Sequence, residues 1–168
     1  MSKSLKRVAA ALQAAGIETE ILEMPGETRT AADAAREAGC EIDQIAKSII
    51  FLGATSGDVV LFITAGGNRV DPSKASAVAG EPLGRADAMV VREKTGFAIG
   101  GVAPLGHLTP SRVYFDPRLL DFATVYAAAG TPPHSSRSRL GFFSSSQVPW
   151  QATLSPDSAN GHFLACDF

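Results

Sequence analysis

Two apolar runs separated by a tight turn constrain the fold of this chain most strongly. Residues 47–52 read KSIIFL and residues 59–64 read VVLFIT, so each contains a continuous apolar run, and Gly57-Asp58 stands between them. Apolar runs this short, the second followed directly by Ala65-Gly66-Gly67, are typical of buried strands, and Gly-Asp favours a hairpin turn. The two runs therefore predict neighbouring strands at the centre of a sheet.

The remaining segments alternate between helix and strand patterns. Leu5, Val8 and Leu12 follow a helical spacing, so residues 1–15 predict an amphipathic helix. Further helices are expected at 31–38, 72–79 and 86–94, single helical turns at 44–46 (capped by Asp43) and 117–121, and strands at 17–22, 112–115 and 124–128. We expect a single α+β (mixed α/β) domain whose central mixed sheet is partly barrel-like and surrounded by helices.

Length, charge and hydropathy narrow the classes of function. The 168 residues suit one domain, and 15 basic against 17 acidic side chains give a net charge of −2. This balance argues against a protein that wraps a nucleic-acid duplex, so no DNA partner is expected and any RNA contact must be local. No apolar run reaches about 18 residues and the first residues do not resemble a signal peptide, so we expect a cytoplasmic protein without a membrane partner.

The cysteines give no support for a disulfide framework or a metal centre. The chain contains Cys40 and Cys166, with no CxxC motif and no histidine at metal-ligand spacing. A reducing compartment is the simplest interpretation, and neither a metal nor another cofactor is expected.

A glycine-rich segment, residues 95–107, is the least ordinary stretch of the chain. It contains Gly100-Gly101-Val102-Ala103-Pro104 and ends at His107, yet it lacks both the phosphate-loop lysine and the GxGxxG spacing. Nucleotide hydrolysis is therefore not indicated. Glycine lets a ligand approach the backbone and proline fixes the chain path, so the segment could form an oxyanion hole or bind a sugar. A tight structural turn explains the same residues equally well.

The familiar catalytic constellations are absent from the sequence. Nothing resembles GxSxG, and the three histidines are His107, His134 and His162. His107 could reach a ligand from the end of the glycine-rich segment, or it could be hydrogen-bonded within the fold. An acidic pair such as Glu41 and Asp43 lies at an element edge and is most simply solvated.

Lys47 is the residue whose placement most suggests chemistry. It begins an otherwise apolar strand, so its ammonium must leave the strand end or enter a polar site. A lysine that merely extends to solvent explains the position as well. Beside the glycine-rich segment, however, it could stabilise a developing oxyanion or hold a phosphate.

Three segments together resemble a known family. They read TRTAADAA at 28–35, QIAKSIIF at 44–51 and TGFAIGGVAPLGH at 95–107. In order and spacing they are similar to the YbaK/prolyl-tRNA-synthetase-associated domain family, free-standing relatives of the editing insertion in bacterial prolyl-tRNA synthetase. The resemblance covers about residues 1–132.

The resemblance implies trans-editing, the hydrolysis of the ester that joins a wrong amino acid to the 3′ end of tRNA. It indicates a mischarged tRNA for proline as substrate and prolyl-tRNA synthetase as a candidate partner. The attacking group would be a water or, in cysteine-specific members, the thiol of the substrate. The alternative is a noncatalytic tRNA- or synthetase-binding module, and the sequence does not tell which amino acid is removed.

The family motifs also assign roles to residues of this chain. By resemblance, the catalytic residues are Lys47, Gly100 and Gly101. The expected substrate-binding residues are Thr30, Ser48, Phe97, Val102, Ala103, Pro104 and His107, of which Thr30, Ser48 and Phe97 could equally serve in capping or core packing.

The resemblance ends near Pro132-Pro133. Eight of the fifteen serines lie in the last 34 residues, which carry four charged side chains and no sustained period. Residues 133–168 are therefore expected to be a divergent or disordered tail, or the product of a shifted reading frame. His134 lies near the position of a histidine found in some relatives, but its surroundings match too poorly to transfer that role.

Overall fold

The computed structural model describes residues 2–17, 19–24, 30–131, 134–139 and 164–166 of the chain. Its helices are α1 (Lys3–Ala14), α2 (Ala31–Ala38), α3 (Pro72–Ala79) and α4 (Ala88–Thr95), with the 3-10 helices η1 (Ile42–Gln44) and η2 (Pro117–Asp121). Its strands are β1 (Thr19–Glu23), β2 (Ile45–Gly53), β3 (Val59–Ala65), β4 (Leu83–Arg85), β5 (Arg112–Phe115), β6 (Thr124–Ala128), β7 (His134–Arg139) and β8 (Leu164–Cys166). Within this described part, no helix is both long and apolar enough to span a bilayer.

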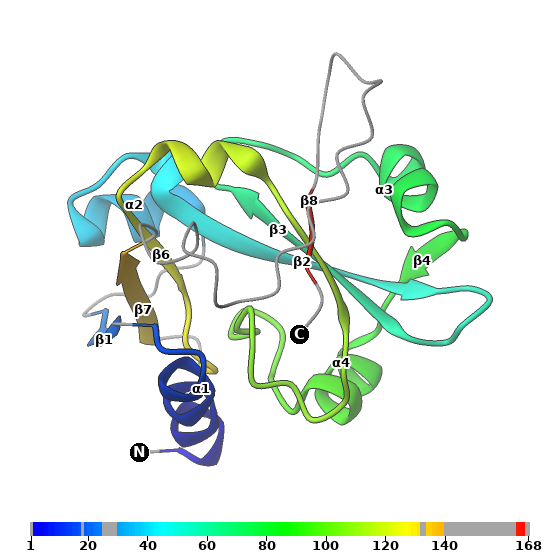
Figure 1. Cartoon of the computed structure of the whole chain (residues 1–168), viewed down its shortest axis with the longest axis horizontal. Helices are drawn as coiled ribbons and strands as arrows, with labels where there is room; N and C mark the ends of the chain where they lie inside the picture. The colour runs from blue at the N-terminus through cyan, green and yellow to red at the C-terminus, as the bar shows by residue number, and fades with distance from the viewer. Residues whose placement is uncertain (1, 18, 25–29, 132–133, 140–163, 167–168) are drawn as a thin grey trace.

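The strands form one mixed sheet (Figure 1). Seven follow the order β1-β7-β6-β2-β3-β5-β8, and β4 pairs with β2 beside that path. Pairing is parallel between β2 and β6 and between β3 and β5, and antiparallel elsewhere. The expected mixed α/β domain with a central sheet is confirmed. Because β1 and β8 remain two separate ends among the described residues, the sheet is open and does not close into a barrel.

β2 and β3 form the predicted hairpin at the centre of the sheet. Their register is continuous through seven residue pairs, and every residue of β3 is buried. A strand covered on both faces has no solvent side, which explains why its sequence is continuously apolar. On one face Phe62 stands edge-on to Phe51, with ring centroids 5.7 Å apart, and stacks on Tyr114 at 5.0 Å.

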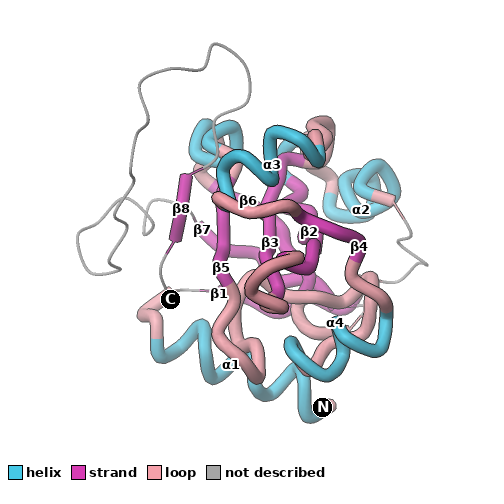
Figure 2. Tube along the Cα trace, turned by 90° about the vertical axis from the view of Figure 1, so that its right-hand side faces the viewer, coloured by secondary structure: helices cyan, strands magenta, loops and turns pink. Residues whose placement is uncertain are grey.

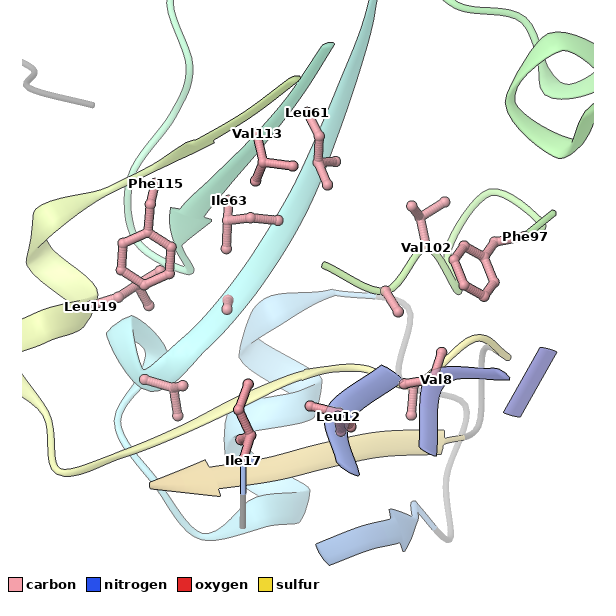
Figure 3. Close-up of a cluster of buried hydrophobic side chains, with 14 of the residues drawn as sticks. Val8, Leu12, Ile17, Leu61, Ile63, Phe97, Val102, Val113, Phe115 and Leu119 are labelled. Carbon is pink, nitrogen blue, oxygen red and sulfur yellow. The ribbon is translucent and has the colours of Figure 1, made fainter. Parts of the chain in front are cut away.

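Apolar side chains cover both faces of this hairpin. On one face α3 supplies Ala75 and Ala79 against Val60 and Phe62. The larger cluster on the other face joins α1, α4 and the glycine-rich segment to the sheet. Figure 3 shows part of that cluster: Val8, Leu12, Ile17, Leu61, Ile63, Phe97, Val102, Val113, Phe115 and Leu119. In Figure 2, α3 lies above the strands and α1 and α4 lie below them.

Two helices end where local sequence signals predict. Thr30 caps α2 by accepting a hydrogen bond from the Asp33 amide at 3.1 Å, and Gly39 ends that helix at φ +64°. Asp71 caps α3 by accepting from two amides of its first turn, and Pro72 occupies the first helical position. Short side-chain acceptors, proline and glycine satisfy helix ends from within the same segment, so these ends need no tertiary contact.

The segment before β2 differs from its prediction. Asp43 does not cap a helical turn, because η1 has Glu41 at its N-cap and Gln44 closes a capping box. Asp43 is also more than a solvated surface acid. Its carboxylate accepts hydrogen bonds from the Gly67 amide at 2.9 Å and from Arg118 Nε at 3.1 Å, and so ties η1 to two later segments.

The sheet continues beyond the boundary placed at residue 132. β7 pairs with β6 on one side and with β1 on the other. Its sequence, HSSRSR, lacks apolar alternation, which is why the pattern did not predict it; backbone pairing does not require apolar side chains. β4, with three residues, was too short to predict. The expected divergent, disordered or frame-shifted tail falls largely on residues 140–163 and 167–168, which lie outside the described residues.

The carboxylate of Glu81 holds the β2–β3 turn. Glu81 accepts hydrogen bonds from the Thr55 and Ser56 amides at 2.8 and 2.9 Å and from Ser56 Oγ at 2.8 Å, and it pairs with Arg112. The hydrogen bonds from Ser56 are the main cause that lowers the pKa of Glu81 from 4.5 to about 2. The ionised form therefore stabilises the folded state.

We expect Glu81→Gln to lower the melting temperature at pH 7, because the amide cannot replace a charged acceptor of four groups. A depressed folded pKa gives stability that is present above the unfolded pKa and lost as pH falls towards about 2. The difference in melting temperature between the wild type and Glu81→Gln should therefore become smaller below pH 4.5 in thermal unfolding curves. Glu93→Gln, at an exposed position of α4, is the control. If the difference in melting temperature stayed constant between pH 7 and pH 3, ionised Glu81 would not be the stabilising group.

Candidate functional site

A cavity of about 410 Å³ opens beside β2. Its walls come from α2, β2, α4, the glycine-rich segment, β6 and the start of β7, and many of its lining residues are alanine, valine and isoleucine. Its polar and ionisable side chains include Thr30, Lys47, Ser48, His134 and Ser135. A concave, mostly apolar site with a few polar groups is what a small-molecule group requires.

The cavity follows an edge of β2 and not one of its faces. On that edge β6 pairs with residues 45 and 46, and β4 pairs with residues 51–53. Residues 47–50 lie between these two partners, and all six residues from 45 to 50 line the cavity. Since side chains alternate between faces, Lys47 lies on the face of Ile49, and Ser48 on the face of Ile50.

Within the described part of the chain, Ser48 has a buried side-chain oxygen, Oγ, that lacks a hydrogen-bond partner. Leaving a buried hydroxyl without a partner costs about 1–3 kcal/mol. A group that carries this cost in the wall of a cavity is suited to bind a ligand.

Lys47 is held by the loop that follows β3. Its Nζ donates to the backbone oxygen of Asn68 at 2.6 Å. Burial is the largest cause that lowers the pKa of Lys47, with Arg69 adding to it and Asp43 and Asp116 opposing it. An ammonium has three donors, so Lys47 can hold Asn68 and still donate to a ligand.

Asp116 fixes the loop that holds Lys47. Its nearly buried carboxylate (7% exposed) accepts from Thr64 Oγ1 at 3.0 Å, the Ala65 amide at 3.0 Å and Asn68 Nδ2 at 2.8 Å. The loop also lies close against η1, where a Cβ at Gly66 would come within 2.1 Å of a backbone oxygen. Lys47 is therefore positioned by contacts formed far along the chain.

The glycine-rich segment contributes backbone to the cavity. Gly100 lines it with φ +86°, and Val102 reaches it while being 3% exposed. Gly101 donates its amide to the Ala98 oxygen at 3.0 Å, which tightens the turn. Gly101, Ala103 and Pro104 are not part of the described lining.

Arg7 of α1 fastens both ends of this segment. Its Nε donates to the Gly106 oxygen at 2.6 Å, and its Nη2 donates to the oxygens of Thr95 and Gly96 at 3.3 and 3.1 Å. The guanidinium also lies over the ring of Phe97, 4.6 Å from its centroid. One side chain thus sets the shape of the loop from a helix at the start of the chain.

Phe97 and His107 contact the glycine-rich segment from the side of the core and are not part of the described cavity lining. Phe97 is 1% exposed in the main core and meets the His107 ring edge-on at 5.6 Å. His107 Nε2 donates to the Ala103 oxygen at 2.8 Å, and its Nδ1 lies 2.9 Å from Ser111 Oγ. Burial is the main cause that lowers the pKa of His107, which favours the neutral ring.

The structure thus divides the ten sequence-predicted site residues into two groups. Thr30, Lys47, Ser48, Gly100 and Val102 meet at the cavity. Phe97, Gly101, Ala103, Pro104 and His107 lie outside its described lining.

His134 lines the cavity, although no role was predicted for it from the sequence. Its Nδ1 lies 2.7 Å from Thr131 Oγ1, the one hydrogen bond of the ring among the described residues. It reaches the cavity because β7 pairs with β6, with Ser135 opposite Ala128. The histidine position in some relatives was the one available signal, since the strand itself has no recognisable pattern. The described residues contain no cluster of three or more potential metal ligands.

Comparison with known proteins identifies the family. The family model of the aminoacyl-tRNA editing domain matches residues 25–139 of the sequence, so β7 lies inside the matched region. The chain is 35% identical over 115 residues to the uncharacterised protein YwhH of Bacillus subtilis (strain 168), covering 68% of this chain and 72% of that one. The chain therefore belongs to the aminoacyl-tRNA editing domain family, in agreement with its resemblance to YbaK-type proteins.

Solved structures show the same fold. One is a candidate trans-editing enzyme for prolyl-tRNA synthetase, with 42% identity and a TM-score of 0.75 over 87% of this chain and 95% of that one. Another is the hypothetical protein APE2540, with 30% identity and a TM-score of 0.71 over 78% and 87%.

Arg7→Ala should loosen the glycine-rich segment. Loss of three charge-assisted hydrogen bonds and a cation–π contact is expected to destabilise the fold by about 2 kcal/mol. Amide hydrogen exchange should rise across residues 95–107 more than in β3. Lys6→Ala, at an exposed position of the same helix, is the control. Unchanged exchange in the segment would show that Arg7 does not hold it.

Proposed function

We propose that this protein is a trans-acting aminoacyl-tRNA deacylase that hydrolyses the ester of a mischarged tRNA for proline. The observation that carries the proposal is the meeting of Lys47 and Gly100 at one cavity in a chain of the editing family. Similarity to a candidate trans-editing enzyme for prolyl-tRNA synthetase supports the choice of tRNA and makes that synthetase a candidate partner. Its place of action would be the cytoplasm, where tRNA is charged.

The chemistry requires orientation and charge stabilisation more than a protein nucleophile. Water attacks the ester carbonyl carbon, the bond to the ribose oxygen breaks, and that oxygen takes up a proton. The products are a free amino acid and uncharged tRNA. The Lys47 ammonium stabilises the negative charge that develops on the carbonyl oxygen, and the backbone at Gly100 and Gly101 orients the ester. His134 belongs to the residue type most often used as a general base, and it is the histidine within the described lining.

The remaining predicted residues have supporting roles in this proposal. Thr30, Ser48 and Val102 form the wall around the amino acid. Phe97, Ala103, Pro104 and His107 act through the shape of the loop. A protein with a net charge of −2 that binds only the 3′ end of tRNA makes few phosphate contacts, so its affinity should depend weakly on salt.

Lys47→Ala should slow deacylation about 100-fold, since removal of an oxyanion donor typically has an effect of this size. The assay measures release of amino acid from alanyl-, cysteinyl- and seryl-tRNA for proline, with Lys6→Ala as control. Equal rates for wild type and Lys47→Ala would refute the role of Lys47. Tight tRNA binding without turnover by the wild type would favour a noncatalytic tRNA- or synthetase-binding module instead.

Deacylation by the wild type should decline at alkaline pH. The active form is the ammonium, and burial lowers the pKa of Lys47 below 10.5, so this form is lost at a lower pH than in an exposed lysine. Lys47→Arg stays charged, and the activity it retains should lack this alkaline decline. The measurement is kcat/KM against pH after subtraction of spontaneous ester hydrolysis. The same decline in both proteins would assign it to another group.

A further inference from the structure

The direction of each backbone group in β2 follows from two hydrogen bonds at its end. The Gly53 amide donates to the Asp58 oxygen at 2.9 Å, towards β3. The next amide, of Ala54, donates to the Pro82 oxygen at 2.9 Å, towards the β4 side. Successive residues of a strand direct their N–H and C=O groups to opposite sides. Because the β2–β3 register is continuous, the odd-numbered residues of β2 pair with β3 and the even-numbered residues face the other way.

Ser48 consequently directs its backbone into the gap beside β2. Ala46 is paired with β6 and Leu52 with β4, and the β4 ladder extends to the pair Phe51–Arg85, whereas Ser48 has no strand partner on that side among the described residues. Ser48 lines the cavity. At Ser48 the unpartnered side-chain oxygen adds a third polar atom.

From this geometry we propose that Ser48 is the backbone pairing site for the aminoacyl group, which adds to β2 as a strand of one residue. The α-ammonium of the ligand donates to the Ser48 C=O, the ligand carbonyl accepts from the Ser48 N–H, and Ser48 Oγ completes the contact. This is the reciprocal pair that two facing residues form in an antiparallel ladder. The inference rests on the proposed function for the identity of the ligand.

Such pairing defines the substrate class by its backbone. Every amino acid ester offers the ammonium and the carbonyl, so this contact recognises any ester with a free α-amino group. The apolar walls of the cavity then distinguish one side chain from another. Esters whose amino group is acylated or absent would lose the donor to Ser48 C=O.

The test uses a stable analogue, adenosine carrying alanine through a 3′-amide. Its binding should slow exchange of the Ser48 amide at least tenfold by NMR, while the Ile49 amide, already paired with β3, stays protected throughout. The propionyl analogue, which lacks only the ammonium, should bind at least tenfold more weakly. Equal binding of the two analogues, protection of Ile50 without Ser48, or no binding of the alanyl analogue would overturn the proposal.

Hydrolysis separates this inference from the proposed function. If alanyl- and propionyl-tRNA are hydrolysed equally well, relative to their spontaneous rates, the deacylase proposal stands and the pairing fails. Protection of Ser48 by the analogue without hydrolysis of alanyl-tRNA supports the pairing and refutes the deacylase.

Ser48→Ala isolates the side-chain oxygen. It leaves the backbone pair in place, so the Ser48→Ala protein should bind the alanyl analogue several-fold more weakly, with no loss in melting temperature because the removed hydroxyl has no partner in the described structure. Ser73→Ala, at an exposed position of α3, is the control. Wild-type affinity in Ser48→Ala would remove Oγ from the proposal.

Discussion

The pairing of β2 is the constraint on which the rest of the structure depends. On one side β2 is joined to β3 through a continuous register. On the other side β2 pairs with β6 at residues 45 and 46 and with β4 at residues 51–53. Residues 47–50 lie between these two pairings. Every residue of β3 is buried, and its pairing along β2 holds this stretch in place. The cavity lies where β2 changes from one partner to the other.

The contacts around the cavity come from segments that are distant in sequence. Arg7 holds the glycine-rich segment from α1, and Asp116 holds the Asn68 loop that binds Lys47. Both anchors are charged groups that donate to or accept from several backbone or side-chain atoms at once, which makes the loop shapes specific. A preorganised site of this kind suits the hydrolysis of an activated ester, where placing the groups matters more than their intrinsic reactivity.

Much of the fold could be predicted because its signals are local. The apolar runs of β2 and β3, the cap at Thr30 and the Asp71-Pro72 start of α3 each depend on neighbouring residues. β7 could not be predicted, because a strand held by backbone pairs on both sides can be polar. The contacts of Asp43 could not be predicted either, because its partners, Gly67 and Arg118, are far along the chain. The motifs named Lys47, Ser48 and Gly100 as site residues, and the structure places all three at the cavity; their roles stay predictions.

By itself, the sequence determined the apolar hairpin, the helix ends and the motifs of the editing family, since these are written in adjacent residues. Only the tertiary structure decided that Ser48 faces a gap in the sheet, that Lys47 is held by Asn68, and that Phe97 and His107 support the loop and lie outside the cavity lining. The reason is geometric. A residue type fixes what a side chain can donate or accept, whereas strand register and alternation fix where it points, and register is a property of the whole sheet.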